Sequence, residues 1–169
     1  MCEQLANAHD SEDAPDLAIA AVDRYMDAAR ESESIGDVAK MSEASLRLAH
    51  FCDTMLENLY GETESNITSE SANAVNKWLE SSLDESSSNM TEIFIRHALK
   101  ALEISGSGEM SARHLIPRLL VLLRTEFSPG VLRDFGSAIL RVPSWLFLDW
   151  IPQLLSMLAE EASVQDVIA

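Results

Sequence analysis

The sequence has few cysteines, few basic residues and no strand-like alternation of apolar and polar side chains. Its two cysteines, Cys2 and Cys52, provide neither a disulfide framework nor metal-ligand spacing, which is typical of a reducing cytosolic or nuclear compartment. Because no segment alternates with a period of two between turn signals, no β-sheet is expected. These shortages argue against a disulfide-stapled secreted domain and against a β-sheet protein.

The shortage of basic residues makes the chain strongly acidic. It carries 12 basic and 28 acidic side chains in 169 residues, a formal charge of −16. The excess lies in residues 1–89, with 19 acidic and 5 basic side chains, against 9 and 7 in residues 90–169. Since an acidic surface repels a phosphate backbone, direct binding of nucleic acid is not expected.

A long apolar run is also missing. The most apolar stretch, from Trp145 to Leu158, is shorter than the roughly 20 residues that a membrane-spanning helix needs, and Asp149 lies within it. The acidic N-terminal residues lack the positive segment of a secretory signal. We therefore expect no membrane partner, and no use of the glycosylation sequons that begin at Asn66 and Asn89.

Apolar residues recur instead at steps of three and four, which predicts an all-α fold. The clearest pattern spans residues 38–59, where an apolar line opposes a polar line along an amphipathic helix of about six turns. Further helices are expected at about 14–30, 71–83 and 91–104, from Ser128 and from Pro143. Another is expected near Ser111, and because of Pro117 it either starts later than Ser111 or bends at the proline. About seven helices with short turns predict an α-solenoid of antiparallel helical hairpins, of the TPR-like or HEAT-like repeat type.

Local composition predicts the organisation of the chain. Residues 1–13 are polar and lack periodicity, so a disordered or ragged N-terminus is predicted, followed by a helical-repeat domain over residues 14–169. The acidic, serine-rich tract at about 80–90 predicts an exposed loop, with a phosphorylation site as the functional alternative. Helix signals place the end of the first helix at residues 31–34 and the N-cap of the fourth helix at Thr91.

One short motif matches an enzyme signature without its context. The triplet 134–136 reads Asp-Phe-Gly, as in the magnesium site of protein kinases. In kinases it has meaning only with a glycine-rich loop, a strand lysine and a His-Arg-Asp loop, and these are missing from the sequence. We interpret Phe135 as an inward helix position, and expect no catalytic residue in this chain.

The histidines and cysteines give no metal-site pattern. His50, Cys52 and Asp53 are close in sequence, but together they are predicted not to share one helix face. His97 and His114 have no partner at metal-ligand spacing. We therefore expect solvated or hydrogen-bonded histidines, no metal and no cofactor.

The stretch from Val142 to Leu158 is expected to be a helix enclosed by neighbouring helices. A narrow polar line runs along it and just past its end at steps of four, three and four: Asp149, Gln153, Ser156 and Glu160. Trp145 and Trp150 are five positions apart and point in different directions, so both are expected to pack in the core. The alternative is that one of them contacts another domain. The candidate structural or interface residues are Pro143, Trp145, Trp150 and Gln153.

Residues 142–155, Val-Pro-Ser-Trp-Leu-Phe-Leu-Asp-Trp-Ile-Pro-Gln-Leu-Leu, resemble the helix near the end of the FAT region in phosphatidylinositol-3-kinase-related protein kinases. Residues 94–102 and 117–120 are similar to the adjoining helices of that region, in the same order. Residues 48–53 are similar to a FAT helix further upstream. The resemblance is good over residues 92–158, and no catalytic, nucleotide-binding or DNA-contact residue of the family maps onto this chain.

The resemblance implies a non-catalytic helical scaffold that clamps a kinase domain inside a much larger nuclear Ser/Thr protein kinase. Its direct partners would be that kinase domain and the neighbouring helical repeats. The resemblance is greatest to the family member that acts with the Ku heterodimer at DNA double-strand breaks in end joining. It implies that Ku and DNA ends would be reached only through the parent protein. Two alternatives stay open: a FAT segment of a TOR-type relative, and a free-standing helical-repeat adaptor that binds partner proteins.

Overall fold

Helices make up nearly all of the chain that the computed structural model describes, which is residues 14–60, 69–82, 89–104, 110–122, 135–156 and 159. The elements in order are α2 (Ala14–Ile35), α3 (Val38–Tyr60), α4 (Ser69–Ser82), α5 (Met90–Ile104), the 3₁₀ helix η1 (Met110–Leu115), α6 (Ile116–Leu122) and the 3₁₀ helix η2 (Ser144–Trp150). Residues 135–139 and 151–156 are helical as well. Within these ranges no residue lies in a strand, so the predicted all-α class is confirmed.

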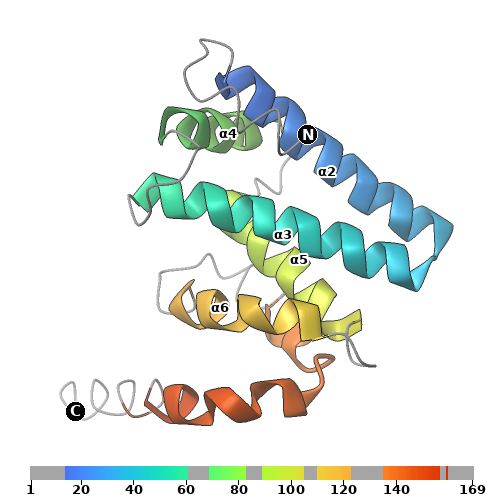
Figure 1. The fold of residues 1–169 in the computed structure, drawn as a ribbon, viewed down its shortest axis with the longest axis vertical. Coiled ribbons are helices and arrows are strands. Elements are labelled where there is room, and N and C mark those ends of the chain that lie inside the picture. The colour runs from blue at the N-terminus through green and yellow to red at the C-terminus, as the bar shows by residue number, and fades with distance from the viewer. Residues whose placement is uncertain are drawn as a thin grey trace.

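The helices are stacked along the long axis of the molecule, with α3 near the centre (Figure 1). α2 and α3 form an antiparallel hairpin, and α4 packs against both of them. α5 packs against α3 and in turn contacts η1 and α6. The C-terminal helical segment lies beyond α6, at the opposite end of the stack from α4.

The core follows the apolar stripes of α3 and α5. Leu48 and Met55 of α3 and Phe94 of α5 have no exposed surface, and Cys52, which lies between Leu48 and Met55 along α3, is also fully buried. Burial raises the pKa of the Cys52 thiol, and the Asp53 carboxylate adds to that effect. Cys52 is therefore a protonated packing group rather than a reactive thiol. The predicted stripe of residues 38–59 is confirmed except at its first turn, since Val38 is 61% exposed at the tip of the hairpin.

α2 is longer than its sequence predicts. The serine-rich residues 31–34 were expected to end the helix, but α2 continues to Ile35. The hydroxyls of Ser32 and Ser34 donate to the carbonyls of Ala29 and Glu31, at 2.7 and 2.8 Å. Because serine can bond back to the preceding turn in this way, it does not end a helix by itself.

The residues that do end α2 and begin α3 are Gly36 and Asp37. Gly36 adopts φ = 73°, the left-handed conformation that commonly closes a helix, and its amide donates to the Ser32 and Glu33 carbonyls at 3.2 Å. Asp37 Oδ1 accepts from the amides of Ala39 and Lys40, at 3.1 and 3.2 Å. The hydrogen bond from the Lys40 amide lowers the pKa of Asp37, as expected for an N-cap carboxylate.

Other helix boundaries also differ from the prediction. α4 runs from Ser69 to Ser82 rather than from residue 71 to 83, and it buries Leu79 completely while Trp78 is half-buried. Pro117 lies in the first turn of α6, so this helix begins later than Ser111 and a 3₁₀ helix precedes it. The predicted N-terminal tail, the centre of the serine-rich loop and the helix start at Ser128 lie outside the described residues.

The N-cap of α5 is Asn89, and not Thr91 as predicted. The Glu92 amide donates to Asn89 Oδ1 at 2.9 Å, and the Ile93 amide donates to the Asn89 carbonyl at 3.1 Å. An asparagine side chain in this position pairs an amide that would otherwise lack a partner in the first turn. Thr91 therefore lies inside the helix.

This assignment gives a test with a matched control. Asn89→Ala is expected to lower the free energy of unfolding by about 1 kcal/mol, because it removes the cap. Thr91→Ala should change it by less than about 0.5 kcal/mol, since Thr91 does not cap the helix. Urea unfolding followed by circular dichroism measures both. A larger loss for Thr91→Ala would show that the cap is wrongly assigned.

Candidate protein interaction surface

The C-terminal arm, residues 135–156, carries the four candidate residues of the sequence. It was predicted to enter one α-helix at Pro143, but η2 is a 3₁₀ helix and α-helical geometry begins only at residue 151. Pro152 provides the physical reason at the last turn of η2. It has no amide hydrogen, so it cannot donate to Leu148 four residues earlier. The Leu148 carbonyl instead accepts from the Ile151 amide, in the shorter 3₁₀ pattern.

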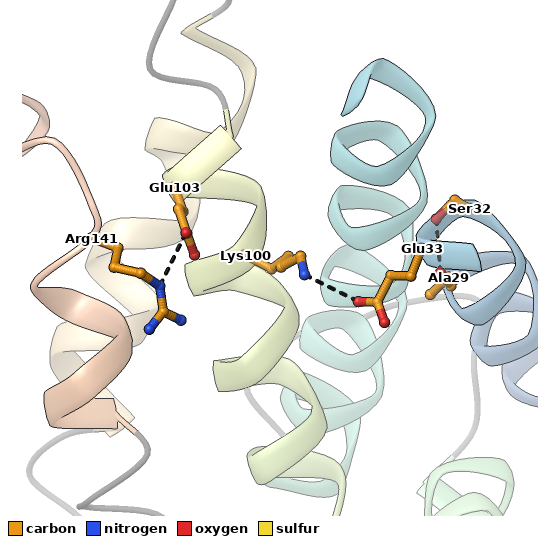
Figure 2. A network of polar contacts seen from close by, with 6 residues as sticks. All are labelled: Ala29, Ser32, Glu33, Lys100, Glu103 and Arg141. Carbon is orange, nitrogen blue, oxygen red and sulfur yellow. Dashed lines mark hydrogen bonds and ion pairs between the residues drawn. The ribbon is translucent and has the colours of Figure 1, made fainter. Parts of the chain in front are cut away.

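Ion pairs position the start of the arm against the rest of the fold. Arg141 Nε donates to Glu103 Oε1 of α5 at 3.0 Å, and one turn earlier Lys100 Nζ lies 3.3 Å from Glu33 Oε1 of α2. Figure 2 shows these contacts as a series running from the arm through α5 to α2. The side chains are partly exposed, so the pairs contribute little stability and serve chiefly to set orientation.

Apolar side chains anchor the arm more firmly. Leu146 is 1% exposed and Val142 is 6% exposed. Phe147, Trp150 and Leu154 are half-buried and pack against the core. The steps from 147 to 150 and to 154 place these three side chains along the inner side of the arm.

The outer side of the arm is an exposed apolar ridge. Its members are Trp145, Leu148, Ile151 and Leu155, which are 44%, 60%, 44% and 60% exposed. In a 3₁₀ helix residues three apart are eclipsed, so the first three lie in line. Leu155 follows one α-helical turn after Ile151 and continues the line. A continuous row of large exposed apolar side chains is typical of a surface that another protein covers.

A cation braces one end of the ridge. The Arg113 guanidinium of η1 lies 5.9 Å from the centre of the Trp145 ring. Arg113 Nη2 also donates to Asp149 Oδ2 at 2.5 Å. Trp145 is thus held in place by a cation–π contact although nearly half of its surface is exposed.

The four candidate residues have different environments. Pro143 is half-buried and precedes η2, and Trp150 is half-buried against the core. Trp145 belongs to the ridge, so the prediction that it packs in the core is wrong for the described part of the chain. Gln153 is exposed. The expected enclosure of this helix by neighbours is likewise not found among the described residues, although its polar line is exposed as predicted at Asp149, Gln153 and Ser156.

A small pocket lies between α5 and the arm. Its volume is about 230 Å³, and its walls include Ile95, Leu99 and Phe135 together with the two ion pairs described above. Burial lowers the pKa of His97, which also lines the pocket, to about 4. His97 is therefore neutral at physiological pH. None of the described lining residues is a serine, threonine or cysteine, so these residues supply no hydroxyl or thiol nucleophile.

The sequence did not predict two polar contacts that join α3 to the η1–α6 segment. His114 Nε2 lies 2.5 Å from His50 Nε2, and Arg118 Nε lies 2.9 Å from Asp53 Oδ1. Spacing could have indicated the two halves separately, because His50 and Asp53 are three residues apart, and His114 and Arg118 four. The prediction that His50, Cys52 and Asp53 do not share one face is therefore wrong for His50 and Asp53, which both contact the η1–α6 segment.

The described residues contain no group of three or more His, Cys, Asp or Glu side chains placed to hold a metal ion. Within the same residues, no helix is both long and apolar enough to cross a membrane.

Comparison with known proteins finds similarity to a short part of a much longer protein kinase. The relative is the DNA-dependent protein kinase catalytic subunit of Xenopus laevis, which is 27% identical over 129 residues. The matched part is 76% of this chain and 3% of the relative. No family model and no solved structure matches the chain.

Neighbouring residues on the arm give a test of which side faces the core. Leu146→Ala is expected to lower the free energy of unfolding by about 3 kcal/mol, because it removes a fully buried side chain. Trp145→Ala should lower it by about 1 kcal/mol or less, since much of that side chain is exposed. Urea denaturation gives both values. A greater loss for Trp145→Ala would mean that the ridge is part of the core.

Proposed function

We propose that this chain is a non-catalytic scaffold segment of a Ser/Thr protein kinase related to the DNA-dependent protein kinase catalytic subunit. In this proposal it forms part of a FAT-type helical-repeat region. The parent protein acts in the nucleus in the repair of DNA double-strand breaks by end joining. It reaches the Ku heterodimer and DNA ends through parts other than this segment.

The observation that carries the proposal is an apolar ridge within the same run that resembles the end of the FAT region. The ridge contains Trp145, Leu148, Ile151 and Leu155. The similarity over 129 residues to a DNA-dependent protein kinase catalytic subunit supports the choice of parent. The all-α architecture of the described residues suits a helical-repeat scaffold.

The proposed role assigns a task to each candidate residue. The ridge, including Trp145, packs against the kinase domain or the next helical repeat. Pro143 sets where η2 begins, and Trp150 fixes the arm to the core from the inner side. Gln153 borders the ridge on its polar side. A scaffold of this kind acts by holding one rigid surface against its neighbour, and it needs no reactive group.

The size of the natural polypeptide tests the proposal most directly. An epitope tag inserted into the endogenous gene, at codons for an exposed residue such as Ser156, allows the product to be isolated and sequenced by mass spectrometry. We expect a polypeptide far longer than 169 residues that contains kinase catalytic motifs. A product of about 169 residues would favour the free-standing adaptor instead. Kinase motifs of the TOR type would favour that relative as the parent.

The ridge can then be tested in the parent protein. Leu148→Glu places a charge where the proposal has an apolar contact, and burying an unpaired charge is costly. We expect kinase activity to fall by about tenfold or more, while this variant of the 169-residue chain unfolds at the same urea concentration as the unmodified chain. Ser156→Glu adds the same charge on the polar line and should leave activity unchanged. Equal activities of the two variants would contradict the role of the ridge.

A further inference from the structure

The contact between His50 and His114 has an unusual geometry. Their Nε2 atoms are 2.5 Å apart, their ring planes differ by 8°, and the ring centres are 4.3 Å apart. Two ring faces cannot approach much closer than roughly 3.5 Å. The rings therefore meet edge to edge, with one Nε2 facing the other. In this arrangement one Nε2–H donates to the lone pair of the other Nε2.

The number of protons on the two rings decides whether this bond can exist. With both rings neutral, one tautomer donates and the other accepts. With one added proton, an imidazolium donates to a neutral ring, which strengthens the bond. With two added protons neither Nε2 has a lone pair, and two positive charges face each other. The contact is therefore compatible with zero or one added proton and incompatible with two.

The surroundings favour the first proton on His114. The carboxylate of Asp53 on α3 interacts favourably with His114, and Glu57 lies in the same acidic group. Partial burial lowers the pKa of His50, which favours that ring as the acceptor, although both rings keep exposed surface. Arg118 of α6 is paired with Asp53 at 2.9 Å, which limits the negative charge available to stabilise a second proton.

The charged groups on the other elements near the two histidines lie against other parts of the fold. Arg113, one residue before His114 in η1, is paired with Asp149 of the arm. α5 packs against both α3 and η1, and its charged side chains line the pocket: Glu92, Arg96, Lys100 and Glu103. The charged groups that act on the histidine pair in this proposal are therefore Asp53 and Glu57 of α3 and Arg118 of α6.

We propose that His50 and His114 form a histidine clasp, which holds the η1–α6 segment to α3 at neutral pH and releases it when both rings are protonated. η1 and α6 pack mainly on α5. The clasp and the Arg118–Asp53 ion pair are two polar contacts that connect them to α3. Release loosens a segment that buries Leu115, Ile116 and Leu119.

The direction of the pH dependence follows from the second proton. In the folded chain that proton binds with a pKa below the ordinary histidine value of about 6.5. The clasp is therefore strongest with one proton bound, at pH values above that at which the second proton binds. The contribution is lost as pH falls through the lower folded-state value.

Titration of the histidine rings by NMR in the 169-residue chain, between pH 5 and 8, tests the clasp itself. We expect His114 to titrate at higher pH than His50. His114→Gln should raise the pKa of His50 towards the ordinary value, because it removes the positive charge that opposes a second proton. His50→Gln should lower the pKa of His114, because it removes the neutral ring that accepts its proton. Two rings that titrate independently, each unaffected by loss of the other, would overturn the proposal.

Hydrogen exchange tests whether the clasp controls the segment. Between pH 7.5 and 5.5 the amides of Leu119 and Leu120 should lose protection by about fivefold after correction for intrinsic rates, which corresponds to coupling of about one pKa unit. This loss should be absent in His114→Gln and in His50→Gln. Both comparisons are made in a His97→Gln background, because His97, with a folded pKa of about 4, would itself take up a proton on unfolding within this pH range. A loss of protection that persists in both clasp variants would overturn the role of the histidines.

Discussion

The arrangement of the described helices depends on the burial of α3 on two sides. One side packs against the helices that flank it in sequence, α2 and α4, and the other packs against α5. Leu48, Cys52 and Met55 have no exposed surface as a result. α5 then carries η1, α6 and the arm, so each later element depends on the position of the one before it. A helical array built by such nearest-neighbour packing has well-defined end surfaces, and the apolar ridge lies near one of them.

Periodicity predicted the helices correctly where one apolar stripe dominates, as in α3 and α5. It failed at the ends of elements, where single side-chain hydrogen bonds decide. Ser32 and Ser34 bond back to the preceding turn and extend α2, and Asn89 caps α5 in place of Thr91. These effects are local and leave recognisable signals in the sequence, such as a glycine next to an aspartate at the end of α2. The same few residues are also compatible with other helix boundaries, so sequence alone does not decide between them.

The candidate surfaces could be predicted only in part, for a different reason. The tryptophans and proline of residues 142–155 marked the arm as important, but exposure is a property of neighbours and not of spacing. Trp145 is exposed and Leu146 is buried because of what packs beside η2, which the sequence of η2 does not encode. The His50–His114 contact joins residues 64 apart, and the Arg113–Asp149 pair joins residues 36 apart. Sequence spacing describes one helix at a time and cannot show which helix faces which.

Pro152 has a consequence for the direction in which the arm presents its outer face. In an α-helix each step of three residues falls about 60° short of a full turn, so Trp145, Leu148 and Ile151 would wind around the helix as a spiral. In the 3₁₀ helix the same steps complete a full turn and the three side chains share one bearing. The 3₁₀ winding, whose last turn is favoured by the missing amide of Pro152, thus aligns these side chains. It turns a spiral of apolar groups into a straight edge, which a partner of any secondary structure can follow without coiling around the arm.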